Sequence, residues 1–279
     1  MEAFVSGDVP WEPVANHRSG EVYRKFLREG ELAPGVGFTA DLVKFSEGDG
    51  AFIAPRHRHD YDQFRLTLEG CPDYGRDVLA PAGQVAYFPA GAHYGPERIE
   101  GGSILQVQWS HSWVTRQQYD EMRDQLSQTG RFEEGSYISV DDTGTEQRAD
   151  AANAVIEAVK RKRFGVEALA FPTPRYPQPL VMNPDAFAWR PDGNGLSTKV
   201  LGRYTENDVY ASKHRWDDDD ATLVLSAERT QLLWISAGSV RIGDASYGPE
   251  TAIWSAYDEI TNVVGGAGAE AVCFGFPIA

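Results

Sequence analysis

Short apolar runs separated by turn residues dominate the segment from residue 36 to residue 112. Within the runs, apolar and polar residues alternate, which is the pattern of strands with one buried face. Glycine- and proline-containing segments between the runs are typical of tight turns. Short strands at this spacing predict a small antiparallel barrel or jelly roll. The candidate strands are Phe38–Phe45, Phe52–Ile53, Gln63–Leu68, Gln84–Phe88 and Ile104–Trp109.

Residues 113–165 change from an alternating to a helical pattern. Thr115 and Gln118 stand in a capping-box sequence, and apolar residues follow at helical spacing up to Leu126. A second helical run covers residues 149–159 and ends in basic residues, which the C-terminus of a helix favours. We expect these residues to form a short helical connector.

The segments at either side of this pattern contain several prolines. Residues 1–35 are expected to form an arm that wraps the first barrel, with a short helix around Val22–Arg28. Residues 171–191 mix prolines with aromatic side chains, so we expect an ordered, extended segment packed on a barrel rather than a free linker.

A second copy of the barrel pattern lies in the last third of the chain. Gln231–Gly238 echoes Gln63–Gly70, and the turn glycine Gly83 has a counterpart in Gly248. This internal repeat indicates two similar barrels in one chain. The expected domains are an N-terminal barrel with its arm (1–112), the helical connector (113–165) and a C-terminal barrel (166–279).

Two histidines, His57 and His59, stand one residue apart just before a candidate strand. In extended backbone, side chains two residues apart point to the same face, so both imidazoles can bind one metal ion. Gln63 and Arg65 have the same parity and are expected to face the same interior. A third histidine, His93, follows the next strand and a turn.

These two stretches resemble the two motifs of the cupin superfamily. The first motif is HxH, three residues, an acid or amide, six residues and glycine, as in His57–Gly70. The second is glycine, five residues, Pro-x-Gly and a histidine, as in Gly83–His93. The chain departs from the usual pattern at two places. Gln63 stands where most cupins have glutamate, and only Ala92, rather than two residues, precedes His93 after the glycine.

The resemblance implies an all-β fold of two cupin-type jelly-roll β-barrels joined by the short helical connector. It also implies a divalent metal ion held by His57, His59 and His93. Gln63 is then either a further metal ligand or a hydrogen-bond partner of a bound water.

The second barrel lacks these imidazoles. Under the repeat alignment, Leu225, Ala227 and Asp258 occupy the positions of the three histidines. The chain thus looks like a bicupin with a metal-competent N-terminal cupin and a degenerate C-terminal cupin. Two barrels in one chain can satisfy the usual cupin pairing internally, so a monomer or a homodimer is expected.

The resemblance leaves three hypotheses for function. Similar three-histidine cupins include Fe(II) dioxygenases, so the first is an Fe(II)-dependent dioxygenase or oxidoreductase acting on a small aromatic or acidic metabolite. The second is a redox-neutral isomerase, cyclase or lyase that uses Zn, Ni or Mn as a Lewis acid. The third is a non-enzymatic small-molecule-binding cupin, because a fold does not determine a function. Imidazole ligands suit Fe(II), Zn, Ni, Mn and Cu alike.

Gln63 and Arg65 are the candidate catalytic residues. An unpaired guanidinium inside a barrel is costly, so Arg65 needs either a substrate carboxylate or a neighbouring acidic side chain. Both alternatives are open. Four aromatic residues near the motifs either line the pocket or belong to the core: Tyr61, Tyr87, Tyr94 and Trp109.

Composition narrows the set of partners. The net charge is −15, with 41 acidic and 26 basic residues, which disfavours nucleic acid and anionic membranes. A small-molecule substrate is therefore expected. No apolar run approaches the length of a membrane span, and the N-terminus has no signal-peptide pattern. Cys71 and Cys273 lie far apart and form no ligand pattern, which favours a reducing cytoplasm.

Overall fold

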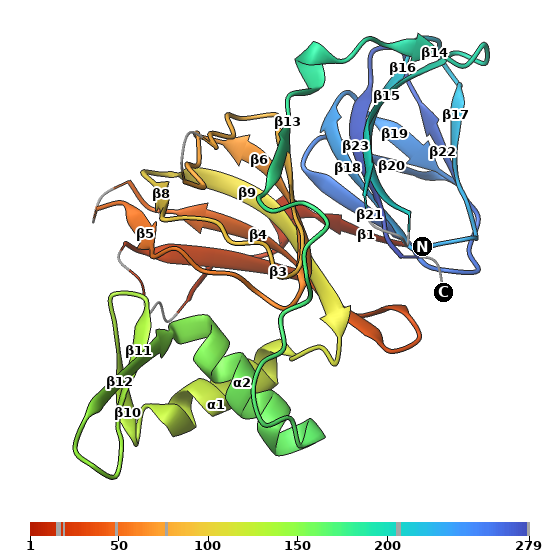
Figure 1. Ribbon diagram of the computed structural model, residues 1–279. Helices are drawn as coiled ribbons and strands as arrows, with labels where there is room; N and C mark the ends of the chain where they lie inside the picture. Colours follow the sequence, from red (N-terminus) through yellow and green to blue (C-terminus); the bar gives the residue numbers. More distant parts are fainter. Residues whose placement is uncertain (15–17, 19, 48–49, 76–77, 205–207, 278–279) are drawn as a thin grey trace. The chain divides into compact units, whose positions relative to one another are not determined.

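The computed structural model describes residues 1–279 apart from 15–17, 19, 48–49, 76–77, 205–207 and 278–279. Strands dominate the described part of the chain, so the all-β prediction is confirmed (Figure 1). The chain divides into two compact units. The first contains Trp11–Gly30 and Gly35–Val181, and the second contains Met1–Pro10, Glu31–Pro34 and Met182–Ala279.

The first unit is built on a seven-stranded sheet, in the order β13-β7-β6-β9-β4-β3-β2, and a two-stranded sheet, β5-β8. All five strands that the alternating pattern predicts are present. The bounds are β2 (Glu12–Pro13), β3 (Val22–Ala33), β4 (Val36–Phe45), β5 (Phe52–Ala54), β6 (Asp62–Glu69), β7 (Val85–Phe88), β8 (Glu97–Ile99), β9 (Gly102–His111) and β13 (Leu180–Met182).

The face of this large sheet that lines the barrel interior carries polar side chains. Arg65, Gln106 and Asp41 lie directly opposite one another on β6, β9 and β4. Residues opposite one another in an antiparallel ladder share a face, so these three side chains form one row. The next row, in the same register, consists of Gln63, Gln108 and Thr39.

The other face of the same strands is apolar and fully buried. Phe64, Val107 and Ala40 form one of its rows, and Leu66 and Leu105 belong to the next. Burial of this apolar face stabilises the sheet at roughly 25 cal/mol per Å² of apolar surface removed from water. The polar side chains of the other face do not contribute to this apolar core. Their position inside the barrel is typical of a binding site.

Two helices belong to the first unit, α1 (Arg116–Leu126) and α2 (Ala151–Phe164), and they pack against each other (Figure 1). The capping box at α1 is confirmed. The Thr115 side chain accepts a hydrogen bond from the Gln118 backbone, and the Gln118 side chain accepts one from the Thr115 backbone. The α2 helix ends at Gly165 in the left-handed conformation. Neither helix is long and apolar enough to cross a membrane.

Between the helices, the chain forms a three-stranded sheet that the helical pattern did not predict. Its strands are β10 (Gly130–Glu133), β11 (Ser136–Val140) and β12 (Glu146–Asp150). Most of their residues are exposed or half-buried, so the sequence carries little of the apolar alternation that reveals a strand with one buried face.

The second unit repeats the large sheet strand for strand, in the order β1-β21-β18-β23-β16-β15-β14. A four-stranded sheet, β17-β22-β19-β20, accompanies it. The bounds are β1 (Glu2–Val5), β14 (Arg190–Pro191), β15 (Leu196–Tyr204), β16 (Val209–Trp216), β17 (Thr222–Leu225), β18 (Gln231–Ala237), β19 (Val240–Ile242), β20 (Ala245–Tyr247), β21 (Thr251–Ser255), β22 (Thr261–Gly265) and β23 (Glu270–Gly275), with 3₁₀ helices η1 (Ser6–Asp8) and η2 (Pro184–Ala186).

The interior of the second barrel is apolar where that of the first is polar. Leu233 of β18 takes the place that Arg65 has in β6, and it packs in a core cluster with Trp216, Leu225 and Ile253. Each of these four side chains in the second barrel is almost fully buried with apolar neighbours.

Two expectations for the N-terminal region differ from the structure. Glu2–Val5 pairs as β1 with β21 and so completes the sheet of the second unit, not of the first. Val22–Arg28 is part of strand β3 and is not a helix. Hydrogen bonding to a neighbouring strand overrides the weak helical preference of such a segment, and local sequence does not reveal that neighbour.

Candidate functional site

His57 and His59 lie side by side just before β6, and both are buried. Their ring centroids are 4.9 Å apart. The backbone at His57 forms an isolated antiparallel bridge with Tyr94, with N–H···O distances of 3.0 and 2.9 Å in the two directions. The expectation that alternate residues place both imidazoles on one side agrees with this geometry.

Both histidines are held in the tautomer that leaves Nε2 with a lone pair. His57 Nδ1 lies 2.7 Å from the Pro55 carbonyl, which can only accept, so Nδ1 carries the proton. His59 Nδ1 lies 3.0 Å from Asn153 Oδ1. The Asn153 amide is oriented by its own donation to the Arg58 carbonyl, so here too Nδ1 is the donor. A hydrogen bond on the far nitrogen is how proteins orient histidines that ligate metals.

Burial keeps both imidazoles neutral. It lowers the pKa of His57, although the nearby Glu97 carboxylate opposes this. Burial, together with the neighbouring His57, lowers the pKa of His59 well below its ordinary value. His57 Nε2 is buried and has no hydrogen-bond partner among the residues that the structure describes. A buried lone pair without a partner is costly and marks a place for a ligand.

His93 does not join the other two histidines. Its side chain is only partly buried, whereas Tyr94 is the residue that turns inward. The Tyr94 ring lies 4.3 Å from that of His57 and 6.0 Å from that of His59. The three-histidine ligand set that the cupin resemblance implies is therefore not assembled among the described residues as the side chains stand. With only Ala92 before it, His93 falls one residue short of the inward-facing position.

The Gln63 side chain is buried and fully engaged. Its Nε2 donates to the Tyr94 hydroxyl at 3.0 Å, and its Oε1 accepts from Arg65 Nε at 3.1 Å and from Gln108 at 3.3 Å. The amide oxygen of Gln63, which is the atom that could bind a metal ion, therefore already accepts two hydrogen bonds. Gln63 thus orients Tyr94 and Arg65 in the barrel interior.

Arg65 enters the barrel, and its acidic partner is Glu97 on β8. Arg65 Nη1 lies 2.5 Å from Glu97 Oε1. The other oxygen, Oε2, lies 3.8 Å from His57 Nε2 and 3.7 Å from Arg18 Nη1. Burial by itself raises the pKa of Glu97, but the Arg65 guanidinium, together with that of Arg18, outweighs burial and holds the pKa below its ordinary value. Glu97 is therefore an ionised, buried carboxylate beside an imidazole lone pair.

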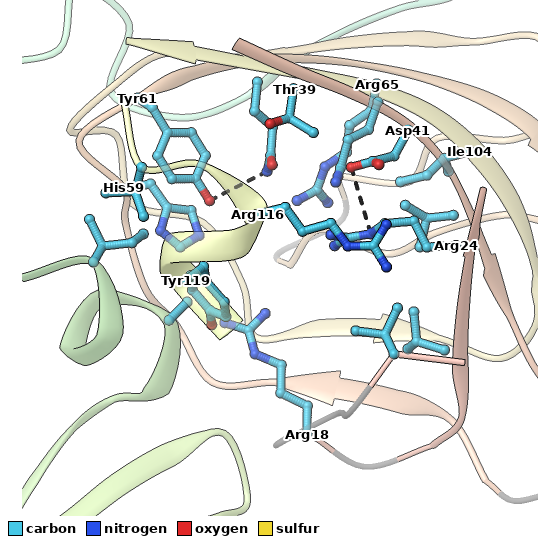
Figure 2. A pocket seen from close by; sticks show the side chains of 18 of the residues that line it. Arg18, Arg24, Thr39, Asp41, His59, Tyr61, Arg65, Ile104, Arg116 and Tyr119 are labelled. Carbon is cyan, nitrogen blue, oxygen red and sulfur yellow. Dashed lines mark hydrogen bonds and ion pairs between the residues drawn. The ribbon is translucent and has the colours of Figure 1, made fainter. Parts of the chain in front are cut away.

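These side chains border a cavity of about 390 Å³ inside the first unit (Figure 2). His59, Arg65 and Glu97 lie on its wall. Helices α1 and α2 contribute Tyr119 and Lys160 to the same wall. The lining is rich in guanidinium groups, unlike the chain as a whole: Arg18, Arg24, Arg65, Arg116 and Arg123.

Aromatic rings cover the histidine end of the cavity. Tyr61 stacks on His59 with ring centroids 4.5 Å apart and planes 7° apart, and Trp113 meets Tyr61 edge to face. Of the four aromatic residues left open by the sequence, Tyr61 lines the cavity and Tyr94 contacts the histidines. Tyr87 and Trp109 pack with Phe64 on the apolar face of the sheet.

The side chains around His57 are of the chemical types that bind divalent metal ions. His57, His59 and Glu97 provide two neutral imidazoles and one carboxylate, a combination typical of non-haem Fe(II) enzymes. As the side chains stand, no three His, Cys, Asp or Glu residues of the described chain lie close enough together to hold an ion. In this arrangement Glu97 Oε1 contacts Arg65, and Oε2 lies 3.8 Å from His57 Nε2.

Comparison with solved structures shows the fold. A protein from Nostoc punctiforme with a provisional assignment as a dioxygenase has a TM-score of 0.61 at 10% identity, over 99% of this chain and 82% of that one. A mutant of Bacillus subtilis oxalate decarboxylase has a TM-score of 0.57 at 13% identity, over 100% and 77%. A protein from Geobacillus kaustophilus has a TM-score of 0.51 at 11% identity, over 99% and 95%.

The chain has the bicupin fold. At these identities the likeness concerns fold alone. No protein-family model matches the sequence, and no curated protein does.

Sequence reasoning did not identify three residues of the site. Glu97 is the first residue of the short strand β8. It pairs with Ala54 of β5, and this pairing places the Glu97 carboxylate beside His57. Asn153 comes from α2, far along the chain from His59. Arg18 reaches both Glu97 and Asp150, at 3.7 and 3.3 Å. The one signal available was the position of Glu97, a charged residue at the start of an alternating Glu-Arg-Ile segment after the second motif.

Proposed function

We propose that this bicupin is a metal-dependent enzyme whose first barrel acts on a small organic acid, with an Fe(II)-dependent dioxygenase or other oxidoreductase as the leading reaction class. The observation that carries the proposal is the pair of imidazoles whose Nε2 atoms keep a lone pair, with the ionised Glu97 carboxylate 3.8 Å from His57 Nε2. Two histidines and one carboxylate are the donor set with which non-haem Fe(II) oxygenases hold their metal and keep room for substrate and dioxygen.

In this proposal His57, His59 and Glu97 hold the metal ion. The ion supplies Lewis-acid or redox chemistry at its open positions. Arg65 keeps Glu97 ionised and sets its position, and Gln63 in turn orients Arg65 through the hydrogen bond at 3.1 Å. Tyr61 and Trp113 shield the His59 side of the site from water.

The guanidinium groups of the cavity favour an anionic substrate. Arg18 and Arg116 lie on the wall together with apolar side chains such as Ile104 (Figure 2). A guanidinium matches a carboxylate with two parallel hydrogen bonds. A cavity of about 390 Å³ lies within the usual range for small-molecule sites. A small acid with an apolar body fits these walls.

Metal analysis and oxygen consumption test the proposal together. Protein purified without added metal is analysed for bound metals, then loaded anaerobically with Fe(II) and supplied with a panel of small aromatic and aliphatic acids in an oxygen electrode. The proposal requires bound metal and substrate-dependent oxygen uptake, both lost in His59→Ala. Protein that takes up no divalent metal contradicts it.

A redox-neutral enzyme is the second candidate. Among the similar solved structures is Bacillus subtilis oxalate decarboxylase, whose metal is described as Mn(II). A buried carboxylate paired with an arginine beside neutral imidazoles also suits proton transfer to or from a bound acid. Conversion of an acid by Mn-, Ni- or Zn-loaded protein without oxygen uptake would select this candidate. Binding without any conversion would select a non-enzymatic cupin.

A further inference from the structure

Asp41 is a buried carboxylate whose position none of the roles above explains. It lies on β4 at the cavity wall, and its exposed fraction is 0%. Across the described chain, nothing donates a hydrogen bond to either of its oxygens. Arg24 faces it, with Nε 3.6 Å from Oδ2, and this Nε has no hydrogen-bond partner among the described residues either (Figure 2). The two charged groups face each other without forming a hydrogen bond.

The other buried ion pairs of the same cavity are different. Arg65 and Glu97 are in contact at 2.5 Å, and so are Lys160 and Asp60. A buried ion pair that serves stability needs such contacts, because desolvation of both charges is otherwise uncompensated. At the Asp41–Arg24 pair the carboxylate is desolvated without such hydrogen bonds, while the Arg24 side chain is 27% exposed. This points to a third group that binds both side chains.

The location of Asp41 relative to the proposed metal site sets the length of the ligand. Asp41, Gln106 and Arg65 lie opposite one another on three adjacent strands. The backbones of Asp41 and Arg65 are separated by two strand spacings, which amount to about 10 Å. The polar end near Asp41 and the end near Arg65 and Glu97 can therefore contact the two ends of one small molecule.

We propose that Asp41 and Arg24 form a second subsite of the cavity, which binds a hydroxyl or amino group at the end of the substrate opposite its acid group. The ligand group donates to the Asp41 carboxylate from the cavity, which Arg24 also lines. The substrate class is then a small organic acid with a hydrogen-bond donor at its far end. This inference rests on the proposed function, since it concerns the same cavity.

Matched pairs of acids test the inference by calorimetric titration. The probes are phenylpropionate, para-hydroxyphenylpropionate and para-aminophenylpropionate, which differ only in the far donor. A donor-bearing acid should bind about tenfold or more tightly than phenylpropionate, as expected for a hydrogen bond to a charged group. Arg24→Met/Asp41→Leu should abolish that preference. Asp120→Asn is the control, because Asp120 lines the same cavity but is 47% exposed and pairs with Arg123 at 3.5 Å.

A stability measurement excludes a purely structural pair. The double variant Arg24→Met/Asp41→Leu should melt at or above the wild-type temperature, because it replaces a buried carboxylate that has no hydrogen bonds, together with the cation facing it, by apolar side chains. A clear drop in melting temperature would overturn the inference. So would equal binding of the paired acids, no binding of either donor-bearing acid, or a preference that survives in the double variant. Metal content is measured in parallel, because its absence would refute the proposed function while leaving the donor preference intact.

Discussion

Tyr94 lies against His57, with 4.3 Å between the ring centroids, and the two residues are joined by both hydrogen bonds of a β-bridge. The bridge turns the Tyr94 side chain inward and leaves its neighbour His93 only partly buried. Because the inward-facing position falls on Tyr94 and not on His93, a phenol takes the place of an imidazole beside His57. The carboxylate of Glu97, 3.8 Å from His57 Nε2, is the remaining ligand-type group on that side.

The first prediction concerns the metal ligands. His57→Ala, His59→Ala and Glu97→Gln should each lower metal content at least tenfold, because two remaining ligands rarely hold a divalent ion at an open site. His93→Ala is the matched control and should retain the wild-type content, since His93 is not part of the buried group. The measurement is elemental analysis after dialysis. Loss of metal in His93→Ala would restore the original three-histidine set.

The second prediction concerns stoichiometry. The second barrel places Leu225 in an apolar core cluster and leaves Asp258 exposed, so it has no pair of adjacent ligands at these positions. We expect about one metal ion per chain, all of it in the first barrel. Metal titration followed by mass spectrometry of the native protein checks this. Two tightly bound ions per chain would contradict it.

The third prediction concerns the Arg65–Glu97 ion pair. Arg65→Met leaves a buried carboxylate without its partner and should lower the free energy of unfolding by about 3–5 kcal/mol. Arg65→Met/Glu97→Leu should recover most of that loss, because both charges are removed together. Urea unfolding of metal-free protein measures both. If Arg65→Met is as stable as the wild type, the ion pair does not matter for stability and Arg65 is free to bind substrate.

The fourth prediction concerns pH and His214 in the second barrel. Burial lowers the pKa of His214 from 6.5 to about 4, while its ring nitrogens contact the Ser212 and Thr198 hydroxyls at 2.8 and 3.1 Å. Between pH 6.5 and pH 4 the unfolded chain binds a proton that the folded chain does not. Protonation of the unfolded chain therefore lowers the free energy of unfolding as the pH falls below 6.5. The loss due to His214 amounts to about 2 kcal/mol at pH 5.

Urea unfolding at pH 7.5 and pH 5 tests this assignment in wild type and in His214→Gln. Other groups also titrate in this range, so the informative quantity is the difference between the two proteins. The variant should lose about 2 kcal/mol less than the wild type over the same interval. Identical losses in the two proteins would show that His214 is protonated in the folded state.

Local spacing revealed only part of the candidate site. The separation of His57 and His59 by one residue and the parity of Gln63 and Arg65 rest on the geometry of extended backbone, and the structure places all four side chains in the interior of the first unit. The same reasoning could not choose between His93 and Tyr94. Adjacent residues of a strand point to opposite faces, so a shift of one residue exchanges them.

The amino-acid sequence by itself determined the all-β class, the repeated barrel pattern, the two helices and the histidine pair. Each of these follows from periodicity or from residues that are neighbours in the chain. Only the tertiary structure decided which distant groups meet. The pairing of β5 with β8 brings Glu97 to His57, α2 brings Asn153 to His59, and β1 joins the sheet of the second unit. Such contacts depend on long-range strand pairing and burial, which are cooperative properties of the whole fold and leave no local pattern.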